Sequence, residues 1–346
     1  MSAKRDTMLR GLDLASASGL EIGALDKPVV PPATPRIFYV DYADTPTLRH
    51  NYRNDPNVEI GDIVQVGGIW GEQTLAEAAA PVAPVDFVVA SHVIEHVPDL
   101  ITWLQELGSV LKPGGQVRLA IPDKRFSFDV LRAETQYADV LTAWLVRARI
   151  PQARAVIDHI YRVTTVDCAQ LWDGSVEPAS LRPNNRPEHA EAIGRDVLEH
   201  GRYHDVHCWV FTPASFAGLM AELADAGYMQ FKCLEFVDTE RNNLEFFAAL
   251  QPCADRAETV ASWKAAQASV EADSPSASGR QALEQRLQQL DAELAAAALA
   301  RDAAAARAAG LEQALAATRS EMDRVMASRS WRLTAPLRAL LGVFRS

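Results

Sequence analysis

The chain has 346 residues, and its 45 acidic and 34 basic side chains give it a formal net charge of −11. Hydrophobic residues make up 48% of the sequence, enough for a substantial core, so a wholly disordered protein is excluded. The acidic balance excludes a general attraction to nucleic acid, and we expect no nucleic-acid partner.

The cysteines and apolar runs bear on the cellular compartment. The four cysteines include no C-x-x-C pair, which argues against a disulfide scaffold and against a cysteine-built zinc site. The basic N-terminus lacks the apolar run of a secretory signal, and no run of about 18 apolar residues occurs that could span a membrane. We therefore expect a cytoplasmic protein.

Residues 1–252 are predicted to form an α/β domain, because short β-branched runs alternate in them with helical patterns. A helix is predicted between the runs at 86–90 and 116–121, with Asp99 as its N-cap. Pro113-Gly114-Gly115 is then expected to end this helix and turn the chain into the next strand. Strand, helix and strand in this order indicate a parallel sheet. The predicted strands are Leu20–Gly23, Ile37–Val40, Asp62–Val66, Asp86–Ala90 and Gln116–Ile121.

The second half of this domain is less regular. Residues 124–206 are long and rich in arginine, and we expect them to be an insertion that covers one end of the sheet. A helix is predicted at Ser215–Ala226. The runs F-K-C-L-E-F and N-L-E-F-F-A-A-L then indicate two strands of an antiparallel hairpin.

The C-terminal part changes in composition. Residues 253–279 are rich in Ala, Ser and charge and are predicted to be a linker. From Leu283 onward, mostly apolar residues recur at alternating intervals of four and three residues, which is the heptad pattern of a coiled coil. The sequence therefore predicts a coiled coil over 280–327, and hence a homo-oligomer. A single solvated helix rich in alanine is the alternative.

Residues 328–346 form a basic amphipathic tail, with several arginines and no acidic residue. Such a tail is suited to an anionic membrane surface, and we expect peripheral contact with the inner membrane. The alternative is a helix that docks on its own or a partner protein.

Two predicted strand ends carry the residues of a nucleoside site. The first strand is Gly19-Leu20-Glu21-Ile22-Gly23, and the second ends at Asp41. A glycine at the first strand end lets a ligand approach the backbone closely, and an acid at the second can accept hydrogen bonds from ribose hydroxyls. The spacing favours a sheet that binds a nucleoside.

Two further segments extend this pattern. These are S-H-V-I-E-H-V-P-D from Ser91 to Asp99, and L-K-P-G-G from Leu111 to Gly115. In order and spacing, the four segments resemble class I S-adenosylmethionine-dependent methyltransferases over roughly residues 10–250. The resemblance implies a Rossmann-like, seven-stranded methyltransferase sheet and S-adenosylmethionine as the cofactor.

The same resemblance implies roles for five residues at the cofactor. Glu21 and Gly23 are expected at its methionine end, and Asp41 is expected to hold the ribose. Ser91 and His92 are expected to line the cofactor at the end of the fourth strand.

The run from His92 to His96 also spells H-x-x-E-H, the inverted pattern of some zinc peptidases. That function needs both histidines on one helix face, whereas this run lies between a strand end and Pro98. Some quinone O-methyltransferases of this fold bind a divalent ion through a similar E-x-x-E-H run. Because His92 replaces the first glutamate here, we expect no metal.

Methyl transfer to an alcohol benefits from a general base, and histidine is the usual candidate. We expect His204, beside Asp205, or His96 to fill this role. His207 is interpreted as a packed residue on a strand with Trp209.

The acceptor is suggested only by the tail. The run S-R-S-W-R-L-T-A-P-L-R is similar to tails of bacterial enzymes of O-antigen and surface-polysaccharide synthesis, which implies a sugar hydroxyl on a lipid-linked or growing glycan. The alternative is a non-catalytic scaffold on a degenerate methyltransferase fold. Two departures favour that alternative: Ala24-Leu25-Asp26 replaces further glycines, and Gly67-Gly68 replaces the acid often found near the adenine.

Overall fold

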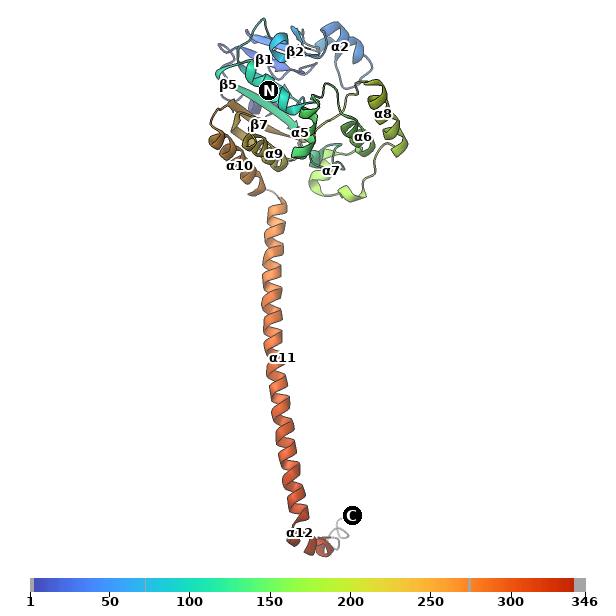
Figure 1. Ribbon diagram of the computed structural model, residues 1–346, viewed down its shortest axis with the longest axis vertical. Helices are drawn as coiled ribbons and strands as arrows, with labels where there is room; N and C mark the ends of the chain where they lie inside the picture. The colour runs from blue at the N-terminus through green and yellow to red at the C-terminus, as the bar shows by residue number, and fades with distance from the viewer. Residues whose placement is uncertain (1–2, 72, 273–274, 339–346) are drawn as a thin grey trace. The chain divides into compact units, whose positions relative to one another are not determined.

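The computed structural model describes residues 3–71, 73–272 and 275–338. The chain divides into two units, Met1–Asp273 and Ser274–Ser346. The first unit holds a sheet, and the second is helical (Figure 1).

A seven-stranded sheet in the order β3-β2-β1-β4-β5-β7-β6 forms the centre of the first unit. The first five strands are parallel, and β7 is antiparallel to both of its neighbours. The predicted α/β class, the seven-stranded sheet and the closing hairpin are therefore confirmed. The strands are β1 (Gly19–Ile22), β2 (Ile37–Asp41), β3 (Gly68–Ile69), β4 (Val85–Ser91), β5 (Leu111–Pro122), β6 (Phe231–Val237) and β7 (Glu245–Pro252).

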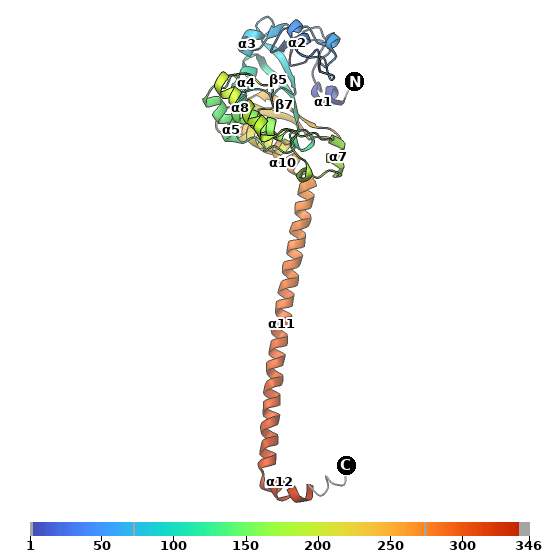
Figure 2. The ribbon, with the colours of Figure 1, turned by 90° about the vertical axis from the view of Figure 1, so that its right-hand side faces the viewer.

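Helices cover both faces of this sheet, because alternate residues of a strand point to opposite sides. On β4, Val88 and Ala90 pack into the larger core with α4, while Phe87 and Val89 pack with Met8 of α1. Figure 2 shows α1 on one side of the sheet and α4 and α5 on the other. The helices are α1 (Ala3–Met8), α2 (Thr45–Asn51), α3 (Leu75–Ala78), α4 (Leu100–Ser109), α5 (Tyr137–Leu145) and α9 (Pro213–Asp225).

The predicted third strand, Asp62–Val66, is not a strand. Ile60–Asp62 is a short 3-10 helix, η1, and the third strand is the two-residue β3. The N–H of Val66 donates to Thr45 Oγ1, and the Thr45 hydroxyl donates to the carbonyl of Val64. A side chain thus satisfies backbone groups that a neighbouring strand would otherwise bind.

The predicted linker is also corrected, because residues 256–272 form α10 (Arg256–Ala272), which packs on α9 and β6. Trp263 is 0% exposed, and its Nε1 donates to the carbonyl of Phe231 at 2.7 Å. Trp263, Ala266 and Val270 are buried at helical spacing, a pattern hidden by the Ala-, Ser- and charge-rich composition. The first unit therefore extends beyond residue 252.

Residues 124–206 contain short helices and depart from the strand–helix alternation, as predicted for an insertion. The helices α6 and α8 pack on each other, and Val156, Val197 and Val206 are buried between them and the segment that follows. The elements are η2 (Lys124–Phe126), α5, α6 (Ala153–Arg162), α7 (Cys168–Asp173), η3 (Pro178–Ser180) and α8 (Pro187–His200).

The second unit consists of α11 (Pro275–Ala327) and α12 (Arg329–Leu333), with Ser328 as the N-cap of α12. The long helix expected over 280–327 is present, while its pairing stays a prediction. No helix among the described residues is long and apolar enough to cross a membrane. The last part of the predicted tail, 339–346, lies outside the described residues.

Candidate functional site

The carboxyl ends of β1, β2, β4 and β5 meet at one edge of the sheet, because these strands are parallel. Gly23 follows β1, Asp41 ends β2, and Ser91 ends β4. Glu245 begins β7 at the same edge, since it pairs with Pro122 in the antiparallel register. Ligands of open α/β sheets bind at this edge, so it is the candidate site.

Gly23 has a backbone conformation that requires glycine. Its φ is +69°, and a Cβ atom there would lie 2.8 Å from Cγ2 of Val93 in the loop after β4. The loops after β1 and β4 are therefore in direct contact. Their backbones can approach a ligand that a side chain would exclude.

Asp41 is 8% exposed at the end of β2. Among the described residues, its carboxylate accepts one hydrogen bond, from the N–H of Tyr42 at 2.8 Å. Burial raises the pKa of Asp41 to about 6, because little else stabilises the charged form. A carboxylate with free lone pairs at this position fits two ribose hydroxyls.

Glu21 was expected to contact the cofactor, but its carboxylate binds the protein's own backbone. It is 1% exposed, and its two oxygens accept hydrogen bonds from the N–H groups of Val29 and Val30 at 2.7 and 2.8 Å. Burial raises its pKa to about 7 despite these two bonds. Glu21 thus holds the loop that follows β1, and it acts on the site through that loop.

Ser91 and His92 lie at the end of β4, as predicted. His92 has a φ of +54°, and its Nε2 lies 2.7 Å from Oε2 of Glu245. Glu245 also accepts from Nζ of Lys4 at 2.6 Å. The imidazole of His92 is therefore tied to β7, and Ser91 is half-buried at the edge.

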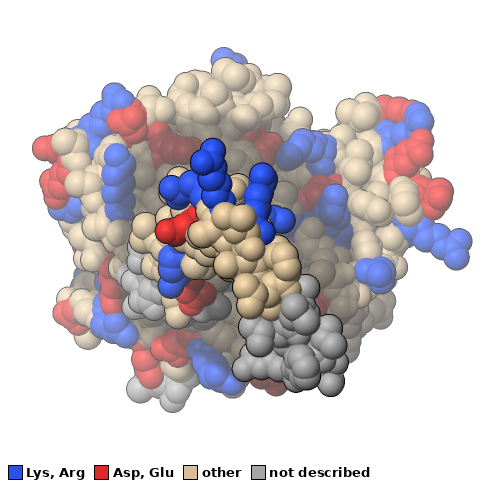
Figure 3. Space-filling model, turned by 90° about the horizontal axis from the view of Figure 1, so that it is seen from below, with Lys and Arg blue, Asp and Glu red and all other residues tan. Residues whose placement is uncertain are grey.

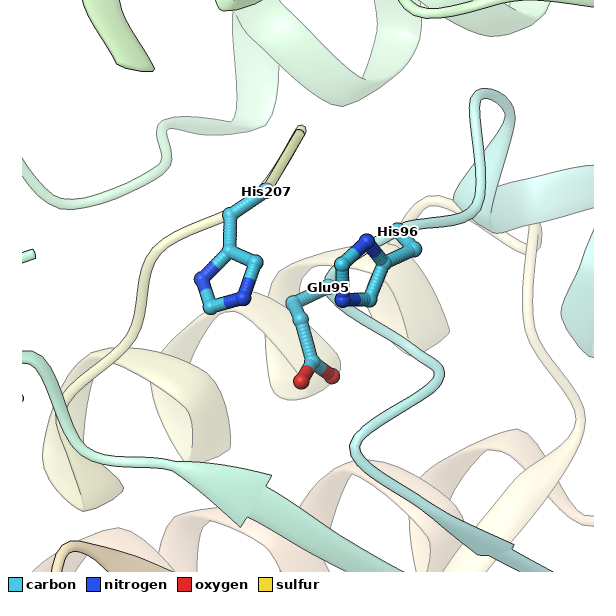
Figure 4. Close-up of side chains that lie close together, drawn as sticks. All are labelled: Glu95, His96 and His207. Atoms are coloured by element: carbon cyan, nitrogen blue, oxygen red, sulfur yellow. The ribbon is translucent and has the colours of Figure 1, made fainter. Parts of the chain in front are cut away.

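Two histidines from distant segments meet beside the loop after β4. The N–H groups of Cys208 and Trp209 donate to the carbonyl of Glu95, at 2.6 and 3.2 Å, and this brings the segment before α9 against that loop. The rings of His96 and His207 are consequently 4.7 Å apart, edge to face. Figure 4 shows the side chains of Glu95, His96 and His207 converging.

Each of these histidines has a carboxylate at its Nδ1 atom. His96 Nδ1 lies 2.9 Å from Asp205 Oδ1, and His207 Nδ1 lies 2.5 Å from Asp129 Oδ2. Burial opposes the charged form of His96, but Asp205 and Glu95 raise its pKa. His96 is half-buried and can act on a ligand, whereas His207 is buried.

His204 does not pair with Asp205, contrary to the prediction. Its Nε2 lies 3.0 Å from Oδ2 of Asp196 on α8, and Asp196 also contacts His200 and Arg202. His204 therefore belongs to a charged cluster on α8. Of the two predicted catalytic histidines, His96 is the one at the strand-end edge.

The sequence interpretation missed His207 as a site residue. His207 is buried, as expected of a packed residue, but it lies in a segment without regular secondary structure and not on a strand. Its partner Asp129 lies 78 residues earlier in the chain. The H-x-x-E-H run contains Glu95 and His96 but not His207, and the signal for His207 was its place in the histidine-rich run from Glu199 to Pro213.

The ligand atoms of Glu95, His96 and His207 all lie within 4.8 Å of one another, so these side chains could hold a metal ion. A half-buried histidine beside a carboxylate could also accept a proton from an acceptor hydroxyl. The edge thus combines Asp41 and Gly23, which could hold a nucleoside, with a group that could activate an oxygen.

Comparison with known proteins supports one family. A family model described as "Methyltransferase domain" matches residues 2–224. No curated protein sequence matches significantly.

Solved structures resemble this fold at low sequence identity. A Rhodobacter sphaeroides structure provisionally described as a Zn-dependent alcohol dehydrogenase is 14% identical, with 73% of this chain and 91% of that chain covered and a TM-score of 0.41. The CcbJ methyltransferase from Streptomyces caelestis is 12% identical, with 72% and 89% covered and a TM-score of 0.36. An S-adenosylmethionine-dependent methyltransferase from Clostridium acetobutylicum is 8% identical, with 68% and 84% covered and a TM-score of 0.35. At these TM-scores the structures add no argument about function.

Proposed function

The chain belongs to the methyltransferase domain family and is an S-adenosylmethionine-dependent methyltransferase, and from this premise we propose that it O-methylates a sugar hydroxyl of a bacterial glycan. The observation that supports methyl transfer is the strand-end edge, where Gly23 and Asp41 follow neighbouring strands and the loop that carries His96 contacts Gly23 through Val93. Its more specific steps concern cofactor contacts, acceptor activation and the place of the reaction.

The residues at the edge fit the cofactor. Asp41 would bind the ribose hydroxyls, because its carboxylate is almost buried and accepts only a neighbouring amide among the described residues. Gly23 would let the backbone approach the methionine end, and Ser91 would line the cofactor at the end of β4. The cofactor supplies a methyl group on a sulfonium sulfur.

We assign activation of the acceptor hydroxyl to His96. An alcohol becomes a better nucleophile as it loses its proton, and correct placement of the two reactants supplies much of the remaining rate. His96 lies on the loop that contacts Gly23, and a carboxylate oxygen of Asp205 lies 2.9 Å from its Nδ1. His204 is held by Asp196 on α8 and is assigned no catalytic role.

A glycan acceptor at a membrane is supported by the C-terminal tail. Arg329, Arg332 and Arg338 alternate along the chain with the exposed apolar residues Trp331 and Leu333, of which Leu333 is 78% exposed, and the Arg338 guanidinium lies 3.6 Å from the Trp331 ring centroid. Figure 3 looks onto this end of the helical unit, where basic side chains stand beside uncharged atoms. Such a surface suits anionic lipid, and it would bring the enzyme to a lipid-linked saccharide. Docking on a protein is the alternative.

A homo-oligomer is supported by α11. Its described seam residues are exposed within the chain, including Leu294, Leu311 and Leu315. A second copy of the helix would cover this seam in a coiled coil.

Isothermal titration of the full chain with S-adenosylmethionine and with S-adenosylhomocysteine tests the cofactor site. We expect saturable binding of both, and at least about a hundredfold loss for Asp41→Ala, the scale of about 3 kcal/mol for two charge-assisted hydrogen bonds. Asp62→Ala is the matched control, since Asp62 is an exposed acid of the same region. Unchanged binding by Asp41→Ala would refute the ribose assignment.

A labelled-methyl transfer assay with lipid-linked and free saccharides tests the acceptor. Incorporation into an ether that survives mild base treatment supports O-methylation of a sugar. Incorporation only into non-carbohydrate acceptors refutes the glycan proposal while leaving methyl transfer intact.

The second candidate function is a scaffold, favoured by Ala24-Leu25-Asp26 in place of further glycines after Gly23. It predicts that a folded chain binds neither cofactor form. That result would direct attention to α11 and the tail.

A further inference from the structure

We propose that Glu95, His96 and His207 bind a divalent first-row transition-metal ion at the edge of the cofactor site. Binding of the ion is independent of the proposed function, but its role, to activate the acceptor oxygen, rests on that function. With the ion bound, both ring nitrogens of His96 are engaged, so His96 acts as a ligand of the ion and not as the general base. The E-x-x-E-H resemblance covers only Glu95 and His96, and with His92 in place of its first glutamate the sequence predicted no metal. The third ligand, His207, comes from the segment that precedes α9.

The burial of Glu95 is the first observation. Its side chain is 1% exposed, and among the described residues neither carboxylate oxygen has a hydrogen-bond partner. The nearest basic group is His92, whose Nδ1 lies 3.6 Å from Glu95 Oε1. A buried carboxylate that accepts no hydrogen bond is costly, and a bound cation would stabilise it.

The orientation of the two histidines is the second observation. Nδ1 of His96 faces Asp205, and Nδ1 of His207 faces Asp129, so the opposite nitrogen of each ring, Nε2, remains for a ligand. Within the described chain, no hydrogen bond engages either Nε2 atom. Figure 4 shows the two rings and the Glu95 side chain turned toward a common space. Metal-binding histidines commonly have the other ring nitrogen fixed by a carboxylate in this way.

The carboxylate that contacts His207, that of Asp129, is itself held in an ion pair. Asp129 is buried and ion-paired with Arg132 at 2.9 Å, and Arg132 contacts Asp158 at 2.8 Å. Because these contacts hold Asp129 in place, its carboxylate fixes the His207 ring. A histidine whose ring is oriented by a buried, ion-paired carboxylate is better suited to bind a metal ion than to serve only as a packed side chain.

The cluster lies beside the cofactor edge. The loop that carries Glu95 and His96 contacts Gly23 through Val93. An ion at the cluster would therefore lie beside the loop that contacts Gly23.

The donor set indicates the class of ion. Two imidazole nitrogens and one carboxylate oxygen suit zinc, iron or cobalt better than magnesium, calcium or manganese. A tetrahedral zinc ion needs donor atoms ~3.4 Å apart, from bonds of ~2.1 Å. Small side-chain rotations would bring atoms now within 4.8 Å to that spacing. Three protein ligands leave a position open, as in catalytic zinc sites, where a hydroxyl oxygen of the acceptor can bind.

The first test measures ion binding without the cofactor. The full chain, treated with EDTA and desalted, is titrated calorimetrically with ZnCl₂, and CoCl₂ is added separately to record visible absorption. We expect about one ion per chain and at least about a hundredfold weaker binding for Glu95→Gln and for His207→Gln, as expected for loss of a direct ligand. Asp129→Asn should weaken binding about 10- to 100-fold, the effect typical of an outer-shell partner.

The matched control is His200→Gln, because His200 is also a histidine beside a carboxylate, Asp196, but lies on α8. It should bind zinc with unchanged affinity and leave the cobalt spectrum unchanged. Loss of binding in this variant, or equal affinity in wild type, Glu95→Gln and His207→Gln, would overturn the proposal. No binding by a folded wild-type chain would also overturn it.

Thermal unfolding provides a readout that does not depend on activity. In EDTA, Glu95→Gln should unfold at a higher temperature than wild type, because the unpaired buried carboxylate is gone. With zinc present, only wild type should gain stability, so the order should reverse. The same order in both conditions would overturn the proposal.

These outcomes are separable from failure of the proposed function. S-Adenosylhomocysteine binding with no zinc binding refutes the metal site and leaves the methyltransferase intact. Zinc binding with no S-adenosylhomocysteine binding refutes the proposed function and leaves the metal site.

Discussion

The two halves of the candidate site are built in different ways. Gly23 and Asp41 occupy the ends of neighbouring parallel strands, and each lies where its own strand ends. Glu95, His96 and His207 are brought together by contacts between segments that are 112 residues apart at Cys208 and His96. A strand-end site is therefore encoded locally, whereas the histidine cluster depends on the contacts of Cys208 and Trp209 with the loop after β4.

The largest expected effect separates the two predicted catalytic histidines. His96→Gln should lower methyl transfer by about 100-fold or more, because a positioned acid–base or activating group typically contributes 10²–10⁴-fold. His204→Gln is the matched control, since it removes a histidine beside a carboxylate on α8 and should change the rate by less than about threefold. Single-turnover rates with bound cofactor give the comparison. A larger loss in His204→Gln would reverse the assignment and restore the sequence-based choice.

Much of the strand-end half could be predicted from the sequence. The periods of the apolar runs located β1, β2, β4 and β5, and Asp99 was identified as the cap of α4, where its Oδ1 accepts from the N–H of Thr102 at 3.0 Å. These features depend on residues near one another in the chain. They follow from local propensity and capping chemistry.

The remaining features could not be predicted, because they depend on distant partners. The Thr45 hydroxyl binds backbone groups of Val64 and Val66 that a neighbouring strand would otherwise bind. Trp263 holds α10 on β6 through a hydrogen bond to the carbonyl of Phe231. The partner of His204 proved to be Asp196, eight residues away, and not its neighbour Asp205. His204 thus does not pair with its sequence neighbour Asp205. The histidine–carboxylate pairs join residues that are distant in the sequence, such as His207 and Asp129.

Gly23→Ala should test whether the strand-end half requires its unusual backbone. The substitution places an L-residue at a φ of +69° and a Cβ atom 2.8 Å from Val93. We expect the affinity for S-adenosylhomocysteine to fall about tenfold or more, with a loss of about 1–2 kcal/mol in the free energy of unfolding.

Gly114→Ala provides the control for backbone strain alone. Gly114 has a φ of +78°, and no atom lies within 4 Å of the place where its Cβ would be, so this variant should lose similar stability but keep its affinity. Equal losses of affinity in both variants would show that general destabilisation, and not the contact with Val93, controls the site.

Glu21→Gln should separate loop support from cofactor contact. Each Glu21 oxygen accepts one backbone N–H, and glutamine would turn an NH₂ group toward one of these donors. We expect the free energy of unfolding to fall by about 1–3 kcal/mol, the cost of an unsatisfied buried group. Urea unfolding measures this loss, with the exposed Glu188→Gln as the control. Full stability with weakened cofactor binding would instead support the direct contact that the resemblance implied.

The smallest expected effect is a pH dependence of cofactor affinity. Burial raises the pKa of Asp41 from 3.8 to about 6, and the carboxylate is the form that accepts hydrogen bonds from ribose hydroxyls. Affinity should therefore be highest well above pH 6, fall to about half at pH 6, and fall further as the carboxyl group is protonated. The same raised pKa reduces stability as the pH rises from about 4 to about 6, because the folded state then binds more protons than the unfolded state. Calorimetric titrations of wild type and Asp41→Asn between about pH 5.5 and 8 isolate the effect, because ionisation of the ligand itself is common to both proteins. A pH profile shared by the two proteins would show that Asp41 is not the titrating group, and would leave the strand-end half of the site without its electrostatic basis.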